Sequence, residues 1–497
     1  MGSRPLTHQL IERFNDDGVV WCHWKSNRDL AESMDGSTDL DLLVDATNFD
    51  VVHEILASLG FRRGQVAGSR VDIGLEDFLG ECEATGNLVH IHTHWRLVSG
   101  EAHYKRFRIP VERLILSSRQ PGEIEGTWVT HPAAETVLLA IRTGLKLRWR
   151  DRLGLLVGHK TGIADIGDEL DWLVQHSSLD QIREFADKML GPTAATAAVG
   201  LATSGPSTKR LLKLRRAVQA DFALQTSLRG PRARAERWHR EFIWLQRGIA
   251  RHYFPRPVLL GRGTPAGGLL VAVIGSDGSG KSTVVKGLHK WFSLKVDTLP
   301  AYFGSGDGNN SLILKPFKLV LKRRKSTSDT LEGASNTDDD PGRLNREPGL
   351  TRVAWALAVS VEKRKALRRA WKARTRGMLV IGDRYPQTQI PGINDGPQLR
   401  AWAQSSSGLK RRISAFEFVP YQRAHRFPPD LILRMRVSPE VAATRRPEHH
   451  PDDLKRRIRI VGSLEFPESL HGVVEIDADQ TQAEVFAAAR KAIFERM

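Results

Sequence analysis

The fold of the C-terminal half of this chain is decided by Gly275-Ser276-Asp277-Gly278-Ser279-Gly280-Lys281-Ser282-Thr283. This stretch fits the pattern G-x-x-x-x-G-K-[ST] in full. The apolar run Leu269–Ile274 before it predicts a strand, and Ser282 to about Trp291 predicts a helix after it. A strand, a glycine-rich turn and a helix in this order predict a parallel α/β sheet.

A turn of this composition is suited to binding phosphate. Its glycines let the backbone wrap closely around phosphate oxygens, so that N–H groups and the helix N-terminus face the anion. Lys281 brings a positive charge to the β- and γ-phosphates of a nucleotide, and the Ser282 hydroxyl is placed to ligate Mg²⁺. The sequence therefore predicts ATP and Mg²⁺ as cofactors, with Gly275–Thr283 as the nucleotide-binding residues.

A second signal is the apolar run from Gly377, which ends in Gly382-Asp383-Arg384-Tyr385. An acid at the carboxyl end of a strand beside the glycine-rich turn lies where ligands bind in parallel sheets. We therefore expect Asp383 to hold the metal and Arg384 to grip an acceptor phosphate with its planar guanidinium. The alternative is a salt bridge between these two side chains at the rim of the sheet.

Arginines follow a third predicted strand, Pro429–Val437, and a helix that begins at Ser438-Pro439-Glu440. Arg445 and Arg446 open a basic stretch that extends to Arg457. On a flap that closes over the triphosphate, such side chains exclude water and offset the charge of the transferring phosphoryl group. The alternative is an exposed helix whose arginines only face solvent.

The chain from about Leu269 to Met497 resembles thymidylate kinase and related nucleoside-monophosphate kinases. The resemblance rests on the glycine-rich turn with Asp277 inside it, the Asp383-Arg384-Tyr385 triplet, the Pro-Asp-Leu strand, the arginine-bearing flap and the closing Ile476-Asp477-Ala478. It implies a P-loop kinase domain in which Asp383 and Arg384 lie beside the acceptor phosphate. Lys281 and the flap arginines, Arg445 and Arg446, would then serve the ATP phosphates.

The acceptor site is expected to differ from that of the family. Family members carry Arg-Glu-Pro-Gly after the second strand, whereas here Arg346–Gly349 lies at the far end of Lys325–Arg346, whose polar composition predicts a mobile loop. Tyr302–Gly308 follows the second strand instead and is predicted to line the acceptor pocket. Pro386–Pro397 also differs from the usual continuation. We expect a small phosphorylated or hydroxyl acceptor whose identity the fold does not fix.

Composition places the chain among folded proteins of a reducing compartment. Hydrophobic residues make up 40% and charged residues 26%, which excludes collagen-like, disulfide-scaffold and wholly disordered classes. The net charge of +17 favours polyanionic partners: nucleotides, nucleic acid or acidic lipid. Cys22 and Cys82 are too few for a disulfide framework. No signal peptide and no apolar run near the roughly 20 residues of a membrane span is visible, so a cytoplasmic protein is expected.

The length predicts two or three domains. We expect a small α/β domain over residues 1–130, a basic helical connector over 131–262 and a three-layer P-loop domain around a parallel sheet over 263–497. The connector is rich in Lys and Arg, which we interpret as a solvated face with Trp238, Phe242 and Trp244 turned inward. Contact with nucleic acid or acidic lipid through the basic helices is the alternative.

An acidic pair marks the N-terminal region. In Gly36–Val44, Asp39 and Asp41 lie two residues apart on a predicted strand, so both point to one face and can ligate a divalent ion. Asp17–Leu97 resembles the nucleotidyltransferase superfamily, in which a Gly-Ser turn precedes an Asp-x-Asp strand and a third carboxylate follows on a later strand.

This region departs from that superfamily at two places. Lys25-Ser26 stands where Gly-Ser is expected, and the later strand, Leu88–Trp95, offers histidines in place of the third acid. His92 can ligate a softer metal, and Asp72 is an alternative third carboxylate. A degenerate domain, whose histidines satisfy local hydrogen bonds, is the other interpretation.

Together these patterns predict an enzyme that transfers the ATP γ-phosphoryl group to a small acceptor with Mg²⁺. Two alternatives stay open. One is an NTP-binding switch or nucleic-acid-associated ATPase that uses the basic helices as its contact surface. The other is a nucleotidyltransferase centred on Asp39 and Asp41, with the P-loop domain in a regulatory role. The sequence leaves the oligomeric state open.

Overall fold

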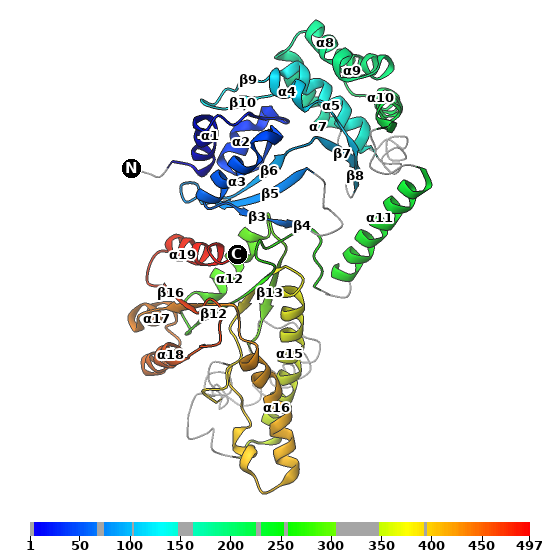
Figure 1. The fold of residues 1–497 in the computed structure, drawn as a ribbon. Helices are drawn as coiled ribbons and strands as arrows, with labels where there is room; N and C mark the ends of the chain where they lie inside the picture. The colour runs from blue at the N-terminus through cyan, green and yellow to red at the C-terminus, as the bar shows by residue number, and fades with distance from the viewer. Residues whose placement is uncertain are drawn as a thin grey trace. The chain divides into compact units, whose positions relative to one another are not determined.

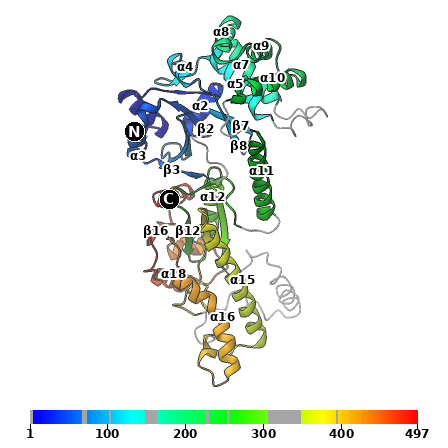
Figure 2. The same ribbon diagram turned by 45° about the vertical axis from the view of Figure 1, so that its right-hand side comes forward.

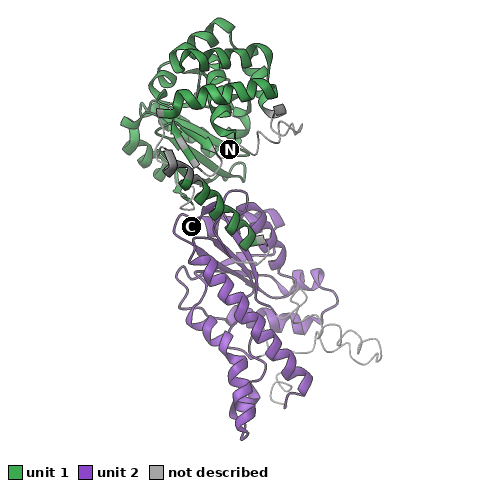
Figure 3. Cartoon of the chain, turned by 90° about the vertical axis from the view of Figure 1, so that its right-hand side faces the viewer, with its two compact units in different colours: residues 1–253 green, residues 254–497 purple. Residues whose placement is uncertain are grey.

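The computed structural model divides the chain into two units, residues 1–253 and 254–497 (Figure 3). It describes residues 4–66, 74–101, 104–147, 163–224, 230–252, 257–304, 347–391 and 395–497. Three predictions lie wholly or partly outside them: the loop Lys325–Arg346, the carboxylate Asp72, and residues 305–308 of the acceptor segment. The division of the chain at residues 130 and 262 stays a prediction.

Unit 1 is built on a seven-stranded mixed sheet in the order β3-β5-β6-β2-β1-β10-β9 (Figure 1). β2 runs parallel to β6 and β1 parallel to β10, whereas the other neighbours are antiparallel. A separate hairpin pairs β7 with β8. The strands of unit 1 are β1 (Trp21–His23), β2 (Asp39–Val44), β3 (Arg62–Arg63), β4 (Gln65–Val66), β5 (Leu75–Glu81), β6 (Leu88–His94), β7 (Val98–Glu101), β8 (Tyr104–Arg108), β9 (Gln120–Pro121) and β10 (Trp128–Val129).

Helices of unit 1 enclose two hydrophobic cores. One core joins Phe14, Trp21 and Leu42 under the first helices, and the other joins Trp24 and Leu43 to the helices that follow residue 130. The helices are α1 (Leu6–Asp16), α2 (Leu30–Asp35), α3 (Phe49–Ser58), α4 (Glu112–Ser117), α5 (Pro132–Lys146), α7 (Ile163–Gln175), α8 (Leu179–Met189), α9 (Pro192–Ser204), α10 (Thr208–Asp221) and α11 (Gly230–His252).

The basic helix α11 corrects one expectation. Trp238 and Phe242 were expected to face inward, but they are 54% and 62% exposed, and Trp244 is 36% exposed. Leu245 and Ile249 are also exposed. Trp238, Phe242, Leu245 and Ile249 follow one another at spacings of four, three and four residues, so they form one apolar stripe along the helix. The inward orientation of these aromatic side chains is therefore wrong.

Unit 2 is built on a five-stranded, wholly parallel sheet in the order β13-β14-β12-β15-β16. Its strands are β12 (Leu269–Gly275), β13 (Thr298–Tyr302), β14 (Leu379–Asp383), β15 (Leu431–Arg436) and β16 (Val473–Asp477), and the short β11 (Arg262–Gly263) precedes them. Every residue of β12 is buried, because a central strand of a parallel sheet is covered on both faces. The predicted α/β fold is confirmed.

Helices cover both faces of this sheet. Leu270 and Ala272 of β12 share a core with Leu367 and Ala370 of α15, so the intervening residue Val271 faces the other way. α12 packs against that strand and against α19, and α15 lies beside α16 in both ribbon views (Figures 1 and 2). The helices are α12 (Lys281–Phe292), α15 (Leu350–Arg374), α16 (Gly408–Arg426), α17 (Pro439–Arg445), α18 (Pro451–Ser463) and α19 (Gln482–Phe494).

Asp430 ties three elements of unit 2 together. Its carboxylate accepts two hydrogen bonds from Arg374 at the end of α15, each 2.6 Å long, and one from the Leu270 backbone N–H of β12 at 2.8 Å. Asp430 is 5% exposed and directly precedes β15. The aspartate of the Pro-Asp-Leu strand therefore fixes β15 against β12, and its role is structural.

We expect Asp430→Ala to lower the free energy of unfolding of unit 2 by about 2–4 kcal/mol, because it leaves a guanidinium and a backbone N–H without their partner. Urea denaturation measures the loss, and hydrogen exchange of the β12 amides assigns it to this unit. Glu448→Ala, which removes an exposed ion pair with Arg446, is the control and should leave both measurements unchanged. Equal stability of the two variants would contradict the structural role of Asp430.

Two remaining expectations concern cysteines and membranes. Cys22 and Cys82 are both buried and unpaired, and burial raises the pKa of the Cys22 thiol to about 12. None of the helices in the described ranges combines the length and apolar character that crossing a bilayer requires.

Candidate functional site

The glycine-rich loop between β12 and α12 has the conformation that close approach to an anion requires. Gly278 and Gly280 have φ angles of 80° and 79°, in the left-handed region that favours glycine. A Cβ on Gly275 would collide with the Ser279 hydroxyl, which itself donates to the Ser276 carbonyl at 2.8 Å. The loop therefore tolerates side chains poorly, and the N-terminus of α12 directly follows it.

Lys281 lies folded back against this loop. Its ammonium donates to the Ser276 carbonyl oxygen at 3.0 Å and lies 3.5 Å from an Asp277 carboxylate oxygen. The side chain is almost fully buried, and burial followed by the nearby Arg384 charge lowers the pKa of the Lys281 ammonium. A cation that is held in a desolvated position interacts strongly with any anion bound beside it.

Asp277 gathers three cations from three different elements. Besides Lys281, it forms an ion pair with Arg457 of α18 and lies 3.6 Å from Arg384 at the end of β14. Burial raises the pKa of the Asp277 carboxyl, but these three cations outweigh it and lower the value to about 2. Asp277, one of the residues on which the resemblance rests, is thus at the centre of the charge network.

The parallel register of the sheet brings Asp383 next to the glycine-rich loop. β14 places Asp383 opposite Val273 of β12, and the Ser282 hydroxyl donates to Asp383 Oδ2 at 2.8 Å. The other carboxylate oxygen, Oδ1, is buried and has no hydrogen-bond partner among the described residues. A carboxylate oxygen without a partner beside a serine hydroxyl fits Mg²⁺, which prefers oxygen ligands.

Arg384 has a strained backbone at the end of β14. Its φ of 69° is rare for a residue with a side chain, and its N–H donates to the Val273 carbonyl at 3.0 Å. Burial lowers the pKa of the Arg384 guanidinium, but the carboxylates of Asp395 and Asp277 raise it by more. The side chain therefore stays positively charged. A Cβ on Gly304 would contact both the Tyr302 hydroxyl and Arg384 Cδ. The described part of the predicted acceptor segment therefore lies against Arg384.

Other predicted site residues have different environments. Arg445 donates to the Gly278 carbonyl at 3.3 Å and to the Ala478 carbonyl at 3.0 Å, so it lies against the loop. Arg446 instead forms an exposed ion pair with Glu448 and is not brought to the loop. Thr283 is exposed on the first turn of α12.

Tyr385, the last residue of the triplet, is buried. Its hydroxyl donates to the Phe427 carbonyl at 2.6 Å, and its ring packs edge-on against Phe303. The side chain therefore belongs to the core below Asp383 and Arg384.

Three charged residues of the network were missed by the sequence analysis as individual site residues: Lys363, Asp395 and Arg457. Lys363 of α15 pairs with Asp395 at 3.2 Å, and both side chains are 3% exposed. Asp395 in turn lies 3.6 Å from Arg384. The only signal that could have identified Lys363 is its position, a cation on the buried side of helix α15. Arg457 was named only as the end of the basic stretch that begins at Arg445.

A cavity of about 750 Å³ opens beside the loop. Ser276 lines one side, and residues of β15, α18 and β16 line the others, among them Arg436, Arg459 and Asp477. Its volume is within the range of small-molecule sites. The Ser276 hydroxyl is buried and has no hydrogen-bond partner among the residues that the structure describes.

The second predicted site lies in unit 1. Asp41 forms an ion pair with Lys25 at 2.9 Å and lies 3.1 Å from His92 and 3.4 Å from His94. Burial raises the pKa of the Asp41 carboxyl, but Lys25 and the two histidines hold it well below its usual range. Lys25 belongs to the Lys25-Ser26 pair that stands where Gly-Ser was expected. Its ammonium thus neutralises the charge of Asp41, the second acid of the Asp39 and Asp41 pair.

Comparison with known proteins identifies relatives but no family. No family model matches the chain. The uncharacterized ATP-binding protein YghR of Escherichia coli K12 is 29% identical over 231 residues, which cover 45% of this chain and 86% of YghR. YghS of the same strain, also named an uncharacterized ATP-binding protein, is 26% identical over 232 residues, or 45% of this chain and 92% of YghS. These names support an ATP-binding protein.

We expect Lys281→Ala to weaken ATP binding by about 10- to 100-fold, because it removes a charge-assisted contact to phosphate of roughly 1.5–3 kcal/mol. Isothermal titration with ATP and Mg²⁺ measures the change. Lys286→Ala on the exposed face of the same helix is the matched control and should bind ATP like the parent chain. Loss of affinity in both variants would mean that general charge rather than the loop binds the nucleotide.

Proposed function

We propose that unit 2 binds ATP at residues Gly275–Thr283 and transfers its γ-phosphoryl group to a small acceptor, as a P-loop kinase similar to thymidylate kinase. The observation that carries this proposal is the 2.8 Å hydrogen bond between Ser282 and Asp383, which brings the loop and the acid–arginine pair into one site. The relatives named for ATP binding support the nucleotide. The proposal includes a cytoplasmic location, because two cysteines are too few for a disulfide framework and fit a reducing compartment.

The side chains then have separate tasks. Lys281 and Arg457 offset the charge of the phosphates, and both are already held beside Asp277. Mg²⁺, when bound by the Ser282 hydroxyl and the Asp383 carboxylate, supplies further positive charge to the phosphates. Arg445 holds the Gly278 and Ala478 backbone next to the loop. Placement and charge neutralisation are what a protein contributes to phosphoryl transfer.

Arg384 favours a phosphorylated acceptor. Its guanidinium is half-buried among carboxylates and stays charged, and Tyr302 and Gly304 lie beside it. An ionised phosphate oxygen of the acceptor would form the new bond to the γ-phosphorus, while the bond to the bridging oxygen breaks and ADP leaves. Because the attacking oxygen already carries a negative charge, no proton has to be removed before attack and the reaction needs no general base.

We expect Arg384→Ala to lower kcat/KM for the acceptor by about 100-fold, because it removes a fixed donor to the acceptor phosphate. ATP affinity should change much less. Turnover is measured against a panel of nucleoside monophosphates and sugar phosphates, and Arg412→Ala, an exposed arginine of α16, is the control. Arg384→Lys should recover only part of the loss, since an ammonium cannot form the planar two-bond contact.

An ATPase or switch that contacts nucleic acid is the second candidate, favoured by α11. Its exposed Trp238 and Phe242 offer stacking surfaces, and the helix carries arginines such as Arg240 and Arg247. Filter binding of single-stranded DNA across salt concentrations tests it. Steeply salt-dependent binding, with ATP hydrolysis but no phosphorylated product, would favour this candidate over the kinase.

The third candidate is a nucleotidyltransferase with a regulatory P-loop unit. Asp39→Ala and Lys281→Ala separate it from the kinase, since only the variant of the essential centre abolishes turnover. If Asp39→Ala alone abolishes product formation, the main chemistry belongs to unit 1 and the kinase proposal is wrong.

A further inference from the structure

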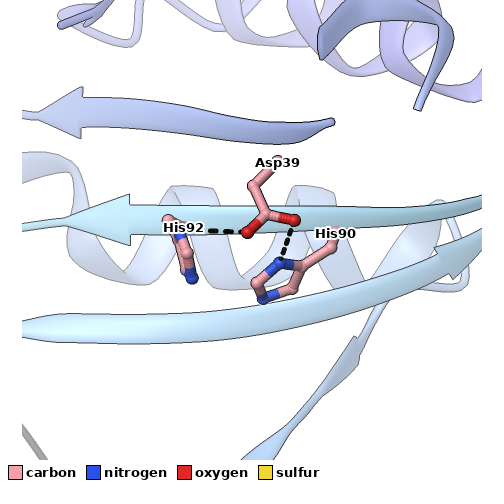
Figure 4. A group of neighbouring side chains, drawn as sticks. All are labelled: Asp39, His90 and His92. Carbon is pink, nitrogen blue, oxygen red and sulfur yellow. Dashed lines mark ion pairs between the residues drawn. The ribbon is translucent and has the colours of Figure 1, made fainter. Parts of the chain in front are cut away.

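A second cluster of polar side chains lies on one face of the unit 1 sheet (Figure 4). The parallel register of β2 and β6 places Asp39 opposite His90 and Asp41 opposite His92. The antiparallel register of β5 and β6 places Asp77 opposite His92. Because side chains alternate along a strand, these residues project from the same face and converge.

Asp39, His90 and His92 can each offer one ligand atom to the same ion. One oxygen of Asp39 lies 2.9 Å from His90 Nδ1, and the other lies 4.0 Å from His92 Nδ1 (Figure 4). One ligand atom from each residue falls within 4.8 Å of the other two. Ligand atoms that share an ion at about 2 Å are separated by roughly 3–4 Å, so small adjustments suffice.

Asp77 lies on the far side of the two imidazoles. One of its oxygens is 2.7 Å from His90 Nε2 and 3.1 Å from His92 Nε2. A carboxylate there can accept the Nε2–H bonds of both imidazoles, which leaves their Nδ1 atoms for a metal ion; the Nδ1 of His92 lies 3.1 Å from Asp41 and 4.0 Å from Asp39. Asp77 is a carboxylate on a strand that the sequence pattern did not predict, β5, so it was not among the candidates for the third carboxylate.

His90 lies between two carboxylates of the cluster. Its side chain is 0% exposed. Its Nδ1 lies 2.9 Å from an Asp39 oxygen and its Nε2 lies 2.7 Å from an Asp77 oxygen, so a metal ion held by Nδ1 and Asp39 would replace the proton between them.

The ligand types and the accessibility of the cluster suit a divalent ion. Lys25 pairs with Asp41, while Asp39 and Asp77 lie against the imidazoles of His90 and His92. Asp39 is 32% exposed, so an ion can enter from solvent and keep water in its open positions, whereas His90 and Asp77 are buried. Two imidazoles and one carboxylate suit a first-row transition ion better than Mg²⁺ or Ca²⁺, which prefer oxygen.

We propose that unit 1 binds one divalent first-row transition-metal ion through Asp39, His90 and His92, with Asp77 orienting both imidazoles. The site is independent of the proposed kinase function, and it differs from an all-carboxylate Mg²⁺ site in its two nitrogen ligands.

The test uses the untagged full chain after chelator treatment. Titration calorimetry with Zn²⁺ should give one site of micromolar or tighter dissociation constant, and millimolar Mg²⁺ should not compete. Asp39→Asn, at the exposed edge of the cluster, should weaken Zn²⁺ binding at least tenfold. His176→Ala, an exposed histidine at the end of α7, is the matched control and should bind like the parent chain.

X-ray absorption of the Zn²⁺-loaded parent chain tests the ligands without any variant. About two imidazole nitrogens are expected. An oxygen-only shell, no measurable Zn²⁺ binding, or equal affinity in Asp39→Asn with an unchanged circular dichroism spectrum would each overturn the proposal. Lys281→Ala should bind Zn²⁺ normally, so failure of the ATP site does not affect the result.

Discussion

The parallel pairing of β12 with β14 is the constraint on which the unit 2 site depends. It aligns the carboxyl ends of the two strands, so that Asp383 emerges beside the loop and accepts the Ser282 hydroxyl. Side chains alternate along a strand, so a register shift of one residue would turn Asp383 to the opposite face. The charge network that links Lys281, Asp277 and Arg384 follows from this alignment, because each of them lies within a few residues of these two strand ends.

Electrostatics explains why the loop contains an aspartate. Cations gathered at one sheet edge repel one another, and Asp277 offsets that repulsion by contacting Lys281, Arg384 and Arg457. On the proposed function, phosphate oxygens would take over part of this role when ATP binds. The cations are then held in position before the ligand arrives, which reduces the reorganisation that phosphoryl transfer requires.

Unit 1 uses the same geometric rule with different side chains. Period-two alternation on three neighbouring strands brings Asp39, Asp77, His90 and His92 to one face. In unit 2 the network is built from carboxylates and permanent cations, whereas in unit 1 imidazoles replace most of the cations. Imidazole nitrogens can ligate metal ions, and guanidinium and ammonium groups cannot. The two clusters are therefore suited to different ligands, a polyphosphate in one and a transition ion in the other.

The sequence by itself determined the local features: the strand, loop and helix around Gly275–Thr283, the pair Asp383-Arg384 at a strand end, and the alternation of Asp39 and Asp41. Each depends on residues that are close along the chain, where periodicity and turn chemistry are visible. Only the tertiary structure decided that Lys363, Asp395 and Asp77 join these groups, that Arg446 stays in solvent and that the aromatic side chains of α11 are exposed. Contacts between distant segments depend on strand order and helix packing, which are set by the burial of whole faces and not by any short stretch of sequence.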